Sequence, residues 1–142
     1  MPKITMACNI DADATTVYRA ISTSDGVRSW FTSGAEIGEG RAVHRPTFPD
    51  VPAPWELRVE RAEEPSTLTL SVIVGPPHWT GTTMTYEIVD RSEGGVVLNF
   101  DHIDFATVDG VREWTIGWAT KMLALRKYAE TGIPDPFFVV SA

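Results

Sequence analysis

The hydrophobic positions near the C-terminal end of the chain repeat with the period of an α-helix. Trp114, Trp118, Met122, Leu125 and Ala129 recur at spacings of three and four, which puts them on one face of a helix over residues 111–132. Four turns of large apolar side chains must lie against an equally apolar surface. In so short a chain, the sheet expected from the preceding residues is the only candidate for that surface.

Within the first thirty residues, the hydrophobic pattern changes from that of a strand to that of two short helices. Residues 4–10 alternate apolar and polar side chains and predict a half-buried strand. Residues 14–22 then predict a helix, with Asp13 as its N-cap. Ser24-Asp25-Gly26 is expected to end this helix, and a second short helix follows that carries Trp30 and Phe31.

From residue 34 onward the alternation is that of β-strands. Turn signals separate these strands, among them Gly75-Pro76-Pro77 and Ser92-Glu93-Gly94-Gly95, and the second of these predicts a hairpin. In the strand that ends before Gly75, the residues expected to face inward are Leu68, Leu70, Val72 and Val74. The strands follow one another rather than alternating with helices, so the chain is expected to be an α+β protein with an antiparallel sheet.

Composition and charge narrow the possible partners. The 142 residues are expected to form one domain, 1–142, of which 43% are hydrophobic and 22% charged. The formal charge of −7 argues against nucleic acid and against an anionic membrane surface. A single cysteine, Cys8, and an N-terminus unlike a signal peptide favour the cytoplasm.

Several motifs, in their order, resemble one superfamily. They are "ATTVYRAIS", "GVRSWF", "RVERAEEPSTLTLSV", "GGVVLNFDHIDF" and the terminal "GWATKMLALRKYAETG". Together they resemble the SRPBCC (START-like, Bet v-type) superfamily, and within it the branch of the heat-shock chaperone ATPase activators. The resemblance implies a helix-grip fold: a curved antiparallel sheet of six or seven strands around the C-terminal helix, with two short helices after strand 1. It also implies an internal cavity for a hydrophobic ligand. The superfamily includes lipid carriers, polyketide cyclases and hormone-binding proteins, so the fold does not decide the function.

The inward-facing positions predict the wall of a ligand cavity between the sheet and the C-terminal helix. Aromatic rings and methionines that meet at imperfect angles are typical of adaptable apolar sites, and this chain has five tryptophans. The alternative is that the same residues form a close-packed core. The candidate ligand-binding residues are Trp30, Phe31, Phe48, Trp55, Leu70, Val72, Met84, Tyr86, Leu98, Phe100, His102, Trp114, Trp118 and Met122.

Two of these residues are also the catalytic candidates. His102 is expected to face inward with Asp104 on the same side, so it could act as a general base, although a structural histidine is the simpler interpretation. Tyr86 could present its hydroxyl to a bound carbonyl group. His44 and His78 lack partners at metal-ligand spacing, and no nucleophile elbow or nucleotide-binding loop is present, so neither a metal nor a cofactor is expected.

The loops and the C-terminal tail leave two questions open. The proline-rich loop 46–54 and the turn 75–79 either frame an entrance to the cavity or only end strands. The apolar tail, residues 133–142, is expected to fold back over the helix or the sheet, with a homodimer contact as the alternative.

Three functions are consistent with these observations. The first is the binding of a hydrophobic or aromatic small molecule in the cavity. The second is a cyclase-, aromatase- or hydratase-like enzyme that uses His102 or Tyr86 in the same cavity, and this hypothesis is weakened if His102 is fully bonded to protein. The third is interaction with a chaperone, which the resemblance implies.

Overall fold

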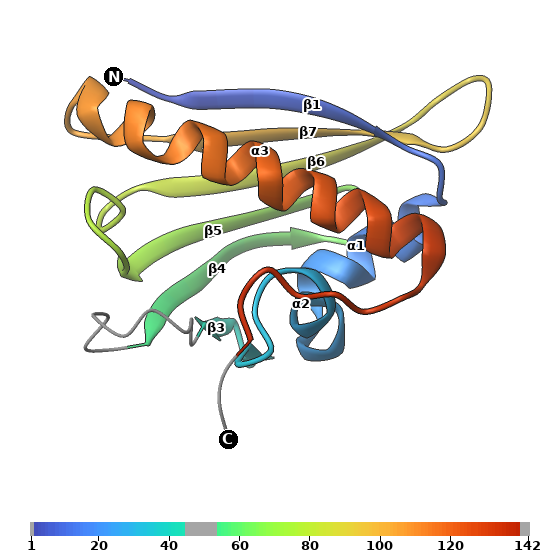
Figure 1. The fold of residues 1–142 in the computed structure, drawn as a ribbon, viewed down its shortest axis with the longest axis horizontal. Coiled ribbons are helices and arrows are strands. Elements are labelled where there is room, and N and C mark those ends of the chain that lie inside the picture. Colours follow the sequence, from blue (N-terminus) through green and yellow to red (C-terminus); the bar gives the residue numbers. More distant parts are fainter. Residues whose placement is uncertain (1, 45–53, 140–142) are drawn as a thin grey trace.

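Seven strands form one antiparallel sheet in the computed structural model, which describes residues 2–44 and 54–139. The order across the sheet is β1-β7-β6-β5-β4-β3-β2, so the first strand lies at one edge beside the last (Figure 1). The strands are β1 (Ile4–Ile10), β2 (Glu36–Gly38), β3 (Arg41–His44), β4 (Trp55–Glu63), β5 (Thr67–Val74), β6 (Thr83–Asp90) and β7 (Val96–Ile103).

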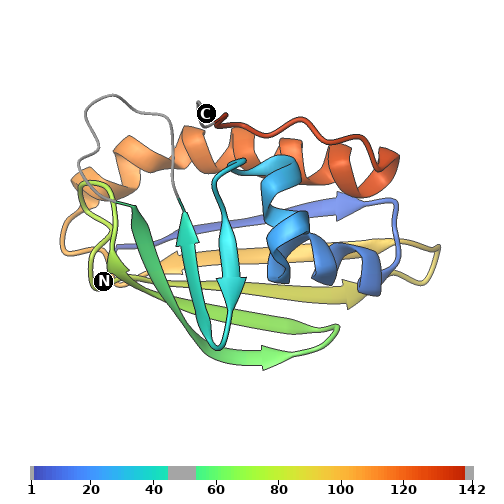
Figure 2. The ribbon, with the colours of Figure 1, turned by 90° about the horizontal axis from the view of Figure 1, so that it is seen from below.

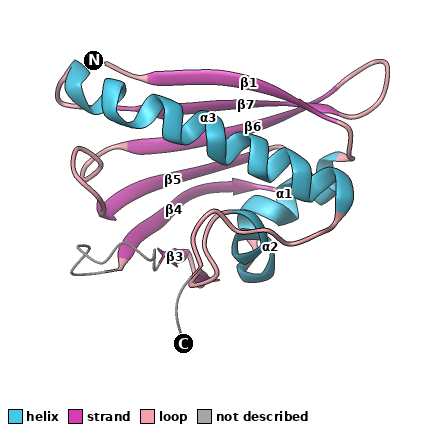
Figure 3. Ribbon diagram, viewed as in Figure 1, coloured by secondary structure: helices cyan, strands magenta, loops and turns pink. Residues whose placement is uncertain are grey.

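Three helices lie on the same side of this sheet (Figures 2 and 3). They are α1 (Ala14–Ser22), α2 (Ser24–Trp30) and the long α3 (Val108–Thr131), which crosses the sheet. The α+β class and the helix-grip architecture predicted from the sequence are therefore confirmed. Helix α3 begins three residues earlier than predicted, and it ends at Gly132, whose left-handed φ of 73° suits glycine.

A single threonine joins α1 to α2. Asp13 caps α1, as predicted, by accepting a 2.7 Å hydrogen bond from the backbone N–H of Thr16. Thr23 ends α1 and caps α2, where its hydroxyl accepts from the N–H of Gly26 at 3.0 Å. The prediction that Ser24-Asp25-Gly26 separates the two helices was wrong, because these residues form the first turn of α2. Gly26 is required there, since a Cβ would lie 2.2 Å from the carbonyl oxygen of Arg19.

Two expected orientations at strand ends also differ. Val74 is 40% exposed rather than buried, because it lies beyond the part of β5 that pairs with β6 and next to a register shift against β4. Asp104 follows the end of β7, has a φ of 69° and is exposed, so it does not share the buried side of His102. The predicted hairpin is present: the N–H of Arg91 donates to the carbonyl of Gly95, and Gly94 and Gly95 both have positive φ.

The described part of the C-terminal tail, residues 133–139, folds back, as the first of the two interpretations expected; residues 140–142 lie outside the described residues. Residues 135–138 run beside residues 29–33, where Asp135, Phe137 and Phe138 donate backbone hydrogen bonds to the carbonyls of residues 29–31. Figure 1 shows this segment returning from the end of α3 past α2. The tail thereby carries the buried ring of Phe138 into the core.

Candidate functional site

A small cavity lies between the two short helices and the sheet. Its volume is about 30 Å³, enough for one water molecule. None of its described lining residues comes from α3. The lining residues are Ile21, Ser22, Val27, Trp30, Phe31, Ile37, Ala42, His44, Val59, Leu68, Leu70 and Tyr86.

Two polar side chains of the cavity wall are a buried histidine and a buried tyrosine; the hydroxyl of Ser22 and the indole N–H of Trp30, which also line it, already donate to backbone carbonyls. His44 is 5% exposed, and its Nδ1 atom has no hydrogen-bond partner among the described residues. Burial lowers the pKa of His44 to about 4, so the ring is neutral at pH 7. Burial also raises the pKa of Tyr86 far above its ordinary value, so its hydroxyl stays protonated. The cavity is therefore uncharged and offers hydrogen-bonding groups within apolar walls.

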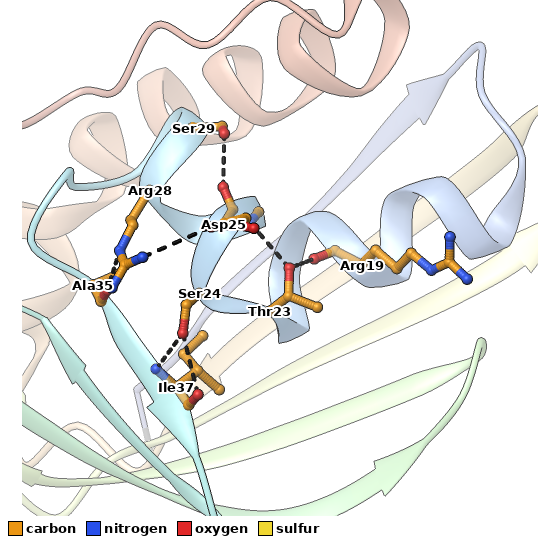
Figure 4. Close-up of polar contacts among 9 residues, drawn as sticks. Arg19, Thr23, Ser24, Asp25, Arg28, Ser29, Ala35 and Ile37 are labelled. Carbon is orange, nitrogen blue, oxygen red and sulfur yellow. Dashed lines mark hydrogen bonds and ion pairs between the residues drawn. The ribbon is translucent and has the colours of Figure 1, made fainter.

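Polar contacts hold α2 over the cavity (Figure 4). The hydroxyl of Ser24 accepts from the N–H of Ile37 at 2.8 Å and donates to its carbonyl at 3.1 Å. Nε of Arg28 donates to the carbonyl of Ala35 at 2.7 Å. These bonds fix α2 to β2 and to the residue before it, so the roof of the cavity is attached to the edge strand of the sheet.

An aromatic cluster adjoins the cavity through the ring of Phe31. We use this term for Phe31, Trp55, Trp79, Trp118 and Phe138, all of which are buried. Trp79 stacks on Trp118 with ring centroids 5.5 Å apart and lies 5.2 Å from Trp55. The indole Nε1 atoms of Trp55 and Trp79 are buried and have no acceptor among the described residues. Buried N–H groups without partners are rare in proteins, which sets this cluster apart from ordinary core.

His102 lies beside the cluster and is fully bonded to protein. Its Nδ1 atom is 3.0 Å from Nε1 of Trp118, which can only donate, so Nδ1 accepts. Its Nε2 atom then donates to the hydroxyl of Thr82 at 2.7 Å, and that hydroxyl donates to the carbonyl of Trp79. Burial and, secondarily, the charge of Lys121 lower the pKa of His102 to about 3. Both ring nitrogens are thus occupied, and the imidazole stays neutral.

Lys121 is 1% exposed and points into a cage of aromatic rings. Its Nζ atom lies between 5.2 and 6.0 Å from six ring centroids. No carboxylate or hydrogen-bond acceptor among the described residues pairs with it, and burial lowers its pKa from 10.5 to about 8. The six rings, which we call the Lys121 cage, are Phe31, Trp79, Trp114, Trp118, Phe137 and Phe138.

The turn after β5 is docked on α3. Nε1 of Trp114 donates to the carbonyl of Pro77 at 2.9 Å, and His78 lies 3.2 Å from the carboxylate of Glu113. Gly110 allows this approach, because a Cβ there would be 2.7 Å from the side chain of His78. The docked turn places Trp79 in the core.

The structure places thirteen of the fourteen predicted ligand-binding residues, and they lie in three places. Trp30, Phe31, Leu70 and Tyr86 line the cavity. Trp114 is half-buried at the start of α3, and Phe48 lies outside the described residues. The others are buried in the core around the cluster: Trp55, Val72, Met84, Leu98, Phe100, His102, Trp118 and Met122.

Three polar or aromatic residues of this region were absent from the predicted site. His44 was considered only as a metal ligand, although the alternation of residues 41–44 places it on the same side as Ala42. Trp79 follows two prolines, so its sequence indicates a turn and not a core position. Lys121 lies on the apolar face of α3, three residues after Trp118 and one before Met122, and this position was the signal that could have identified it.

Comparisons with known proteins agree with this fold. No protein-family model matches the chain, and no curated protein sequence is significantly similar to it. Among solved structures, the Aha1 dimer from Colwellia psychrerythraea superposes with a TM-score of 0.78 at 23% identity, covering 93% of this chain and 98% of that one. An AHSA1-like protein from Aeromonas hydrophila gives 0.72 at 17% identity, covering 92% and 94%.

A third similar structure does not carry the Aha1 name. CalU16 from Micromonospora echinospora superposes with a TM-score of 0.71 at 19% identity, over 94% of this chain and 77% of that one. The resemblance predicted from the motifs is thus confirmed at the level of the fold. No helix among the described residues is long and apolar enough to cross a membrane.

Proposed function

With these similarities as its premise, we propose that the protein binds a hydrophobic or aromatic small molecule in the interior between the sheet and its helices. The observation that carries this proposal is the cavity with an unpartnered nitrogen of His44 in its wall. A buried polar atom without a partner is costly, and a ligand atom that bonds to it would remove that cost.

The size of the cavity sets a condition on this function. Sites for small molecules usually enclose about 300–1,000 Å³, whereas this cavity holds about 30 Å³. A ligand larger than a few atoms therefore needs part of the surrounding wall to move. The wall residues best placed to do so are Trp30 and Phe31 at the end of α2, because they do not belong to the sheet. The tail segment 135–138, which is hydrogen-bonded to residues 29–31, would shift with them.

Native mass spectrometry of the freshly purified protein, followed by a thermal-shift screen of fatty acids, flavonoids, sterols and polyketide-like aromatics, tests the proposal. A co-purified apolar molecule, or a melting temperature that rises with ligand dose, would support it. Val59→Ile adds one methylene group to the cavity wall and should weaken binding. The matched control is Val97→Ile, since Val97 is also half-buried but lies outside the cavity wall. Equal binding by both variants would move the site elsewhere.

An enzymatic function in the same cavity has less support. His102 has no ring nitrogen left for a substrate, which is the condition that weakens this alternative. Tyr86 remains as a proton donor that faces the cavity. An enzyme of this kind would lose turnover in Tyr86→Phe while His102→Asn impaired mainly its stability.

A second candidate is the binding of a protein, either a chaperone or a second copy of the chain. The exposed side of α3 favours it, because Val108, Ile116 and Leu123 repeat at spacings of eight and seven and Ile116 is 77% exposed. The similar Colwellia protein is described as a dimer. Ile116→Lys should abolish self-association through this surface, as measured by light scattering during size-exclusion chromatography, and an unchanged mass would exclude it as the contact between two copies.

A further inference from the structure

We propose that Lys121 is the anchor for the carboxylate of an apolar acid, which is the class of ligand that the interior would select. This inference rests on the proposed function, because it assumes that a small molecule enters the core. It adds recognition of a carboxylate to the binding of an apolar molecule.

The first step of the argument concerns what Lys121 lacks. An ammonium group has three donors and no acceptor. In this structure it has the faces of six rings and no acceptor among the described residues. Aromatic faces attract a cation but accept no conventional hydrogen bond, so they compensate its burial only in part. An anion beside Nζ would supply both the charge and the acceptors.

The second step concerns the neighbouring groups. The indole Nε1 atoms of Trp55 and Trp79 can only donate, and neither has an acceptor among the described residues. The ring of Trp79 lies within 6.0 Å of Nζ and within 5.2 Å of the ring of Trp55. The rings that carry these two N–H groups thus lie in the same part of the core as the ammonium, Trp79 directly beside it and Trp55 beyond Trp79. The oxygens of a carboxylate are acceptors only, which matches this set.

The third step excludes a covalent reaction of the amine. Formation of a Schiff base needs a proton donor to release water from the carbinolamine. The titratable side chain that faces Lys121 from β7 is His102, which is neutral and bonded on both nitrogens. The other elements against Nζ contribute aromatic rings, and Asp135 of the tail lies near Lys127 instead. The arrangement therefore suits ionic recognition.

The apolar body of the ligand would lie in the adjoining cavity. Phe31 links the two sites, since its ring lies 5.4 Å from Nζ and also lines the cavity. Phe137 and Phe138 cover the ammonium from the tail side, so the tail must shift when the acid enters. A flat or linear acid with its carboxylate at one end fits this path.

Two pairs of probes test the anchor. They are naphthalene-2-carboxylate with 2-naphthamide, and decanoate with decanamide, so that each acid is matched by a neutral molecule of the same shape. Titration calorimetry at pH 7 should give the acids about tenfold or greater affinity over the amides. Lys121→Met should remove this preference while the amides still bind. Lys127→Met, an exposed lysine of the same helix, should keep it.

A donor variant and the pH dependence sharpen the test. Trp79→Phe keeps a ring in the cluster but removes one N–H, and should reduce the preference for the acids by a smaller factor. Above pH 8 the ammonium of the free protein loses its proton, so the affinity for the acids should fall while that for the amides stays constant. If the amides bind as tightly as the acids, or if Lys121→Met retains the preference, the anchor is overturned and the proposed function stands. If no probe binds, both are overturned.

Discussion

The two halves of α3 pack against different kinds of interior. Its C-terminal half, with Leu125 and Ala129, lies beside α1 and the end of β1, as the hydrogen bond from the N–H of Asp11 to Glu130 shows. The buried side chains of β1 and α1 are aliphatic apart from that of Tyr18. Its N-terminal half carries Trp118 and Lys121 into the aromatic cluster. All the buried polar side-chain atoms that lack partners within the described residues lie in the cluster or in the wall of the adjoining cavity. The aliphatic half is satisfied by the protein itself, whereas the aromatic half leaves donors unused.

Under the proposed function, the aliphatic half of the core serves stability and the aromatic half serves binding. Close-packed aliphatic groups need nothing further, and their substitution is expected to affect folding alone. A buried cation without an acceptor lowers stability, and proteins commonly keep such groups where they bind something. The comparison therefore predicts two kinds of effect in the aromatic half. A substitution that removes packing should lower the free energy of unfolding, and one that removes the unpaired charge should raise it.

The largest effect is expected from Trp118→Ala. Trp118 is completely buried and its ring contacts those of Phe31, Trp79 and Phe100, so the variant should lose about 3–5 kcal/mol in the free energy of unfolding. Urea denaturation measures the loss. Leu123→Ala is the control, because Leu123 lies on the exposed side of the same helix, is 53% exposed and should cost less. A loss at Trp118 below about 2 kcal/mol would indicate that the aromatic half is looser than its ring contacts imply.

Lys121→Met should instead raise the free energy of unfolding. Burial lowers the pKa of Lys121 from 10.5 to about 8, so the folded state carries a penalty that is complete below pH 8. Removal of the ammonium should stabilise the protein by about 2–3 kcal/mol at pH 7, less whatever the aromatic rings contribute. Lys127→Met, at an exposed position, should change stability by no more than about 0.5 kcal/mol.

The pH dependence of stability checks the same assignment. Between pH 8 and 10.5 the unfolded chain holds the proton of Lys121 and the folded chain does not, so this group makes stability rise with pH in that window. The rise should be present in the wild type and absent from Lys121→Met. A variant that is less stable than the wild type at pH 7, with the rise intact, would show that the ammonium is not the strained group.

Thr82→Val should have an intermediate effect. Valine keeps the shape of threonine but leaves Nε2 of His102 without its acceptor in a fully buried place, at a cost of about 1–3 kcal/mol. Thermal denaturation compares it with Thr83→Val, one residue along at a half-buried position. If Thr82→Val is as stable as this control, the bond between Thr82 and His102 contributes nothing to stability.

The sequence predicted the aliphatic half of the core better than the aromatic half, for a physical reason. Periodicity identifies a residue such as Leu125 because its hydrophobicity and its position agree. At Lys121 they disagree: the position is apolar and the side chain is charged, and only the surrounding rings explain the burial. Trp79 could not be predicted because its place depends on the docking of the turn onto Trp114, a contact between residues 37 apart in sequence.

The smallest effect on stability, and the most direct test of access, is expected from Phe137→Ala. Phe137 is 43% exposed, so its loss should cost only about 1 kcal/mol, yet its ring lies 5.2 Å from Nζ and covers it from the tail side. The chain has three lysines, Lys3, Lys121 and Lys127, so acetylation by acetic anhydride can be followed at each by peptide mass spectrometry. In the variant, Lys121 should react several-fold faster relative to Lys127 than in the wild type. An unchanged ratio of acetylation rates would mean that the ammonium of Lys121 stays inaccessible when the ring of Phe137 is removed. An acid would then have to enter the aromatic half through another part of the wall.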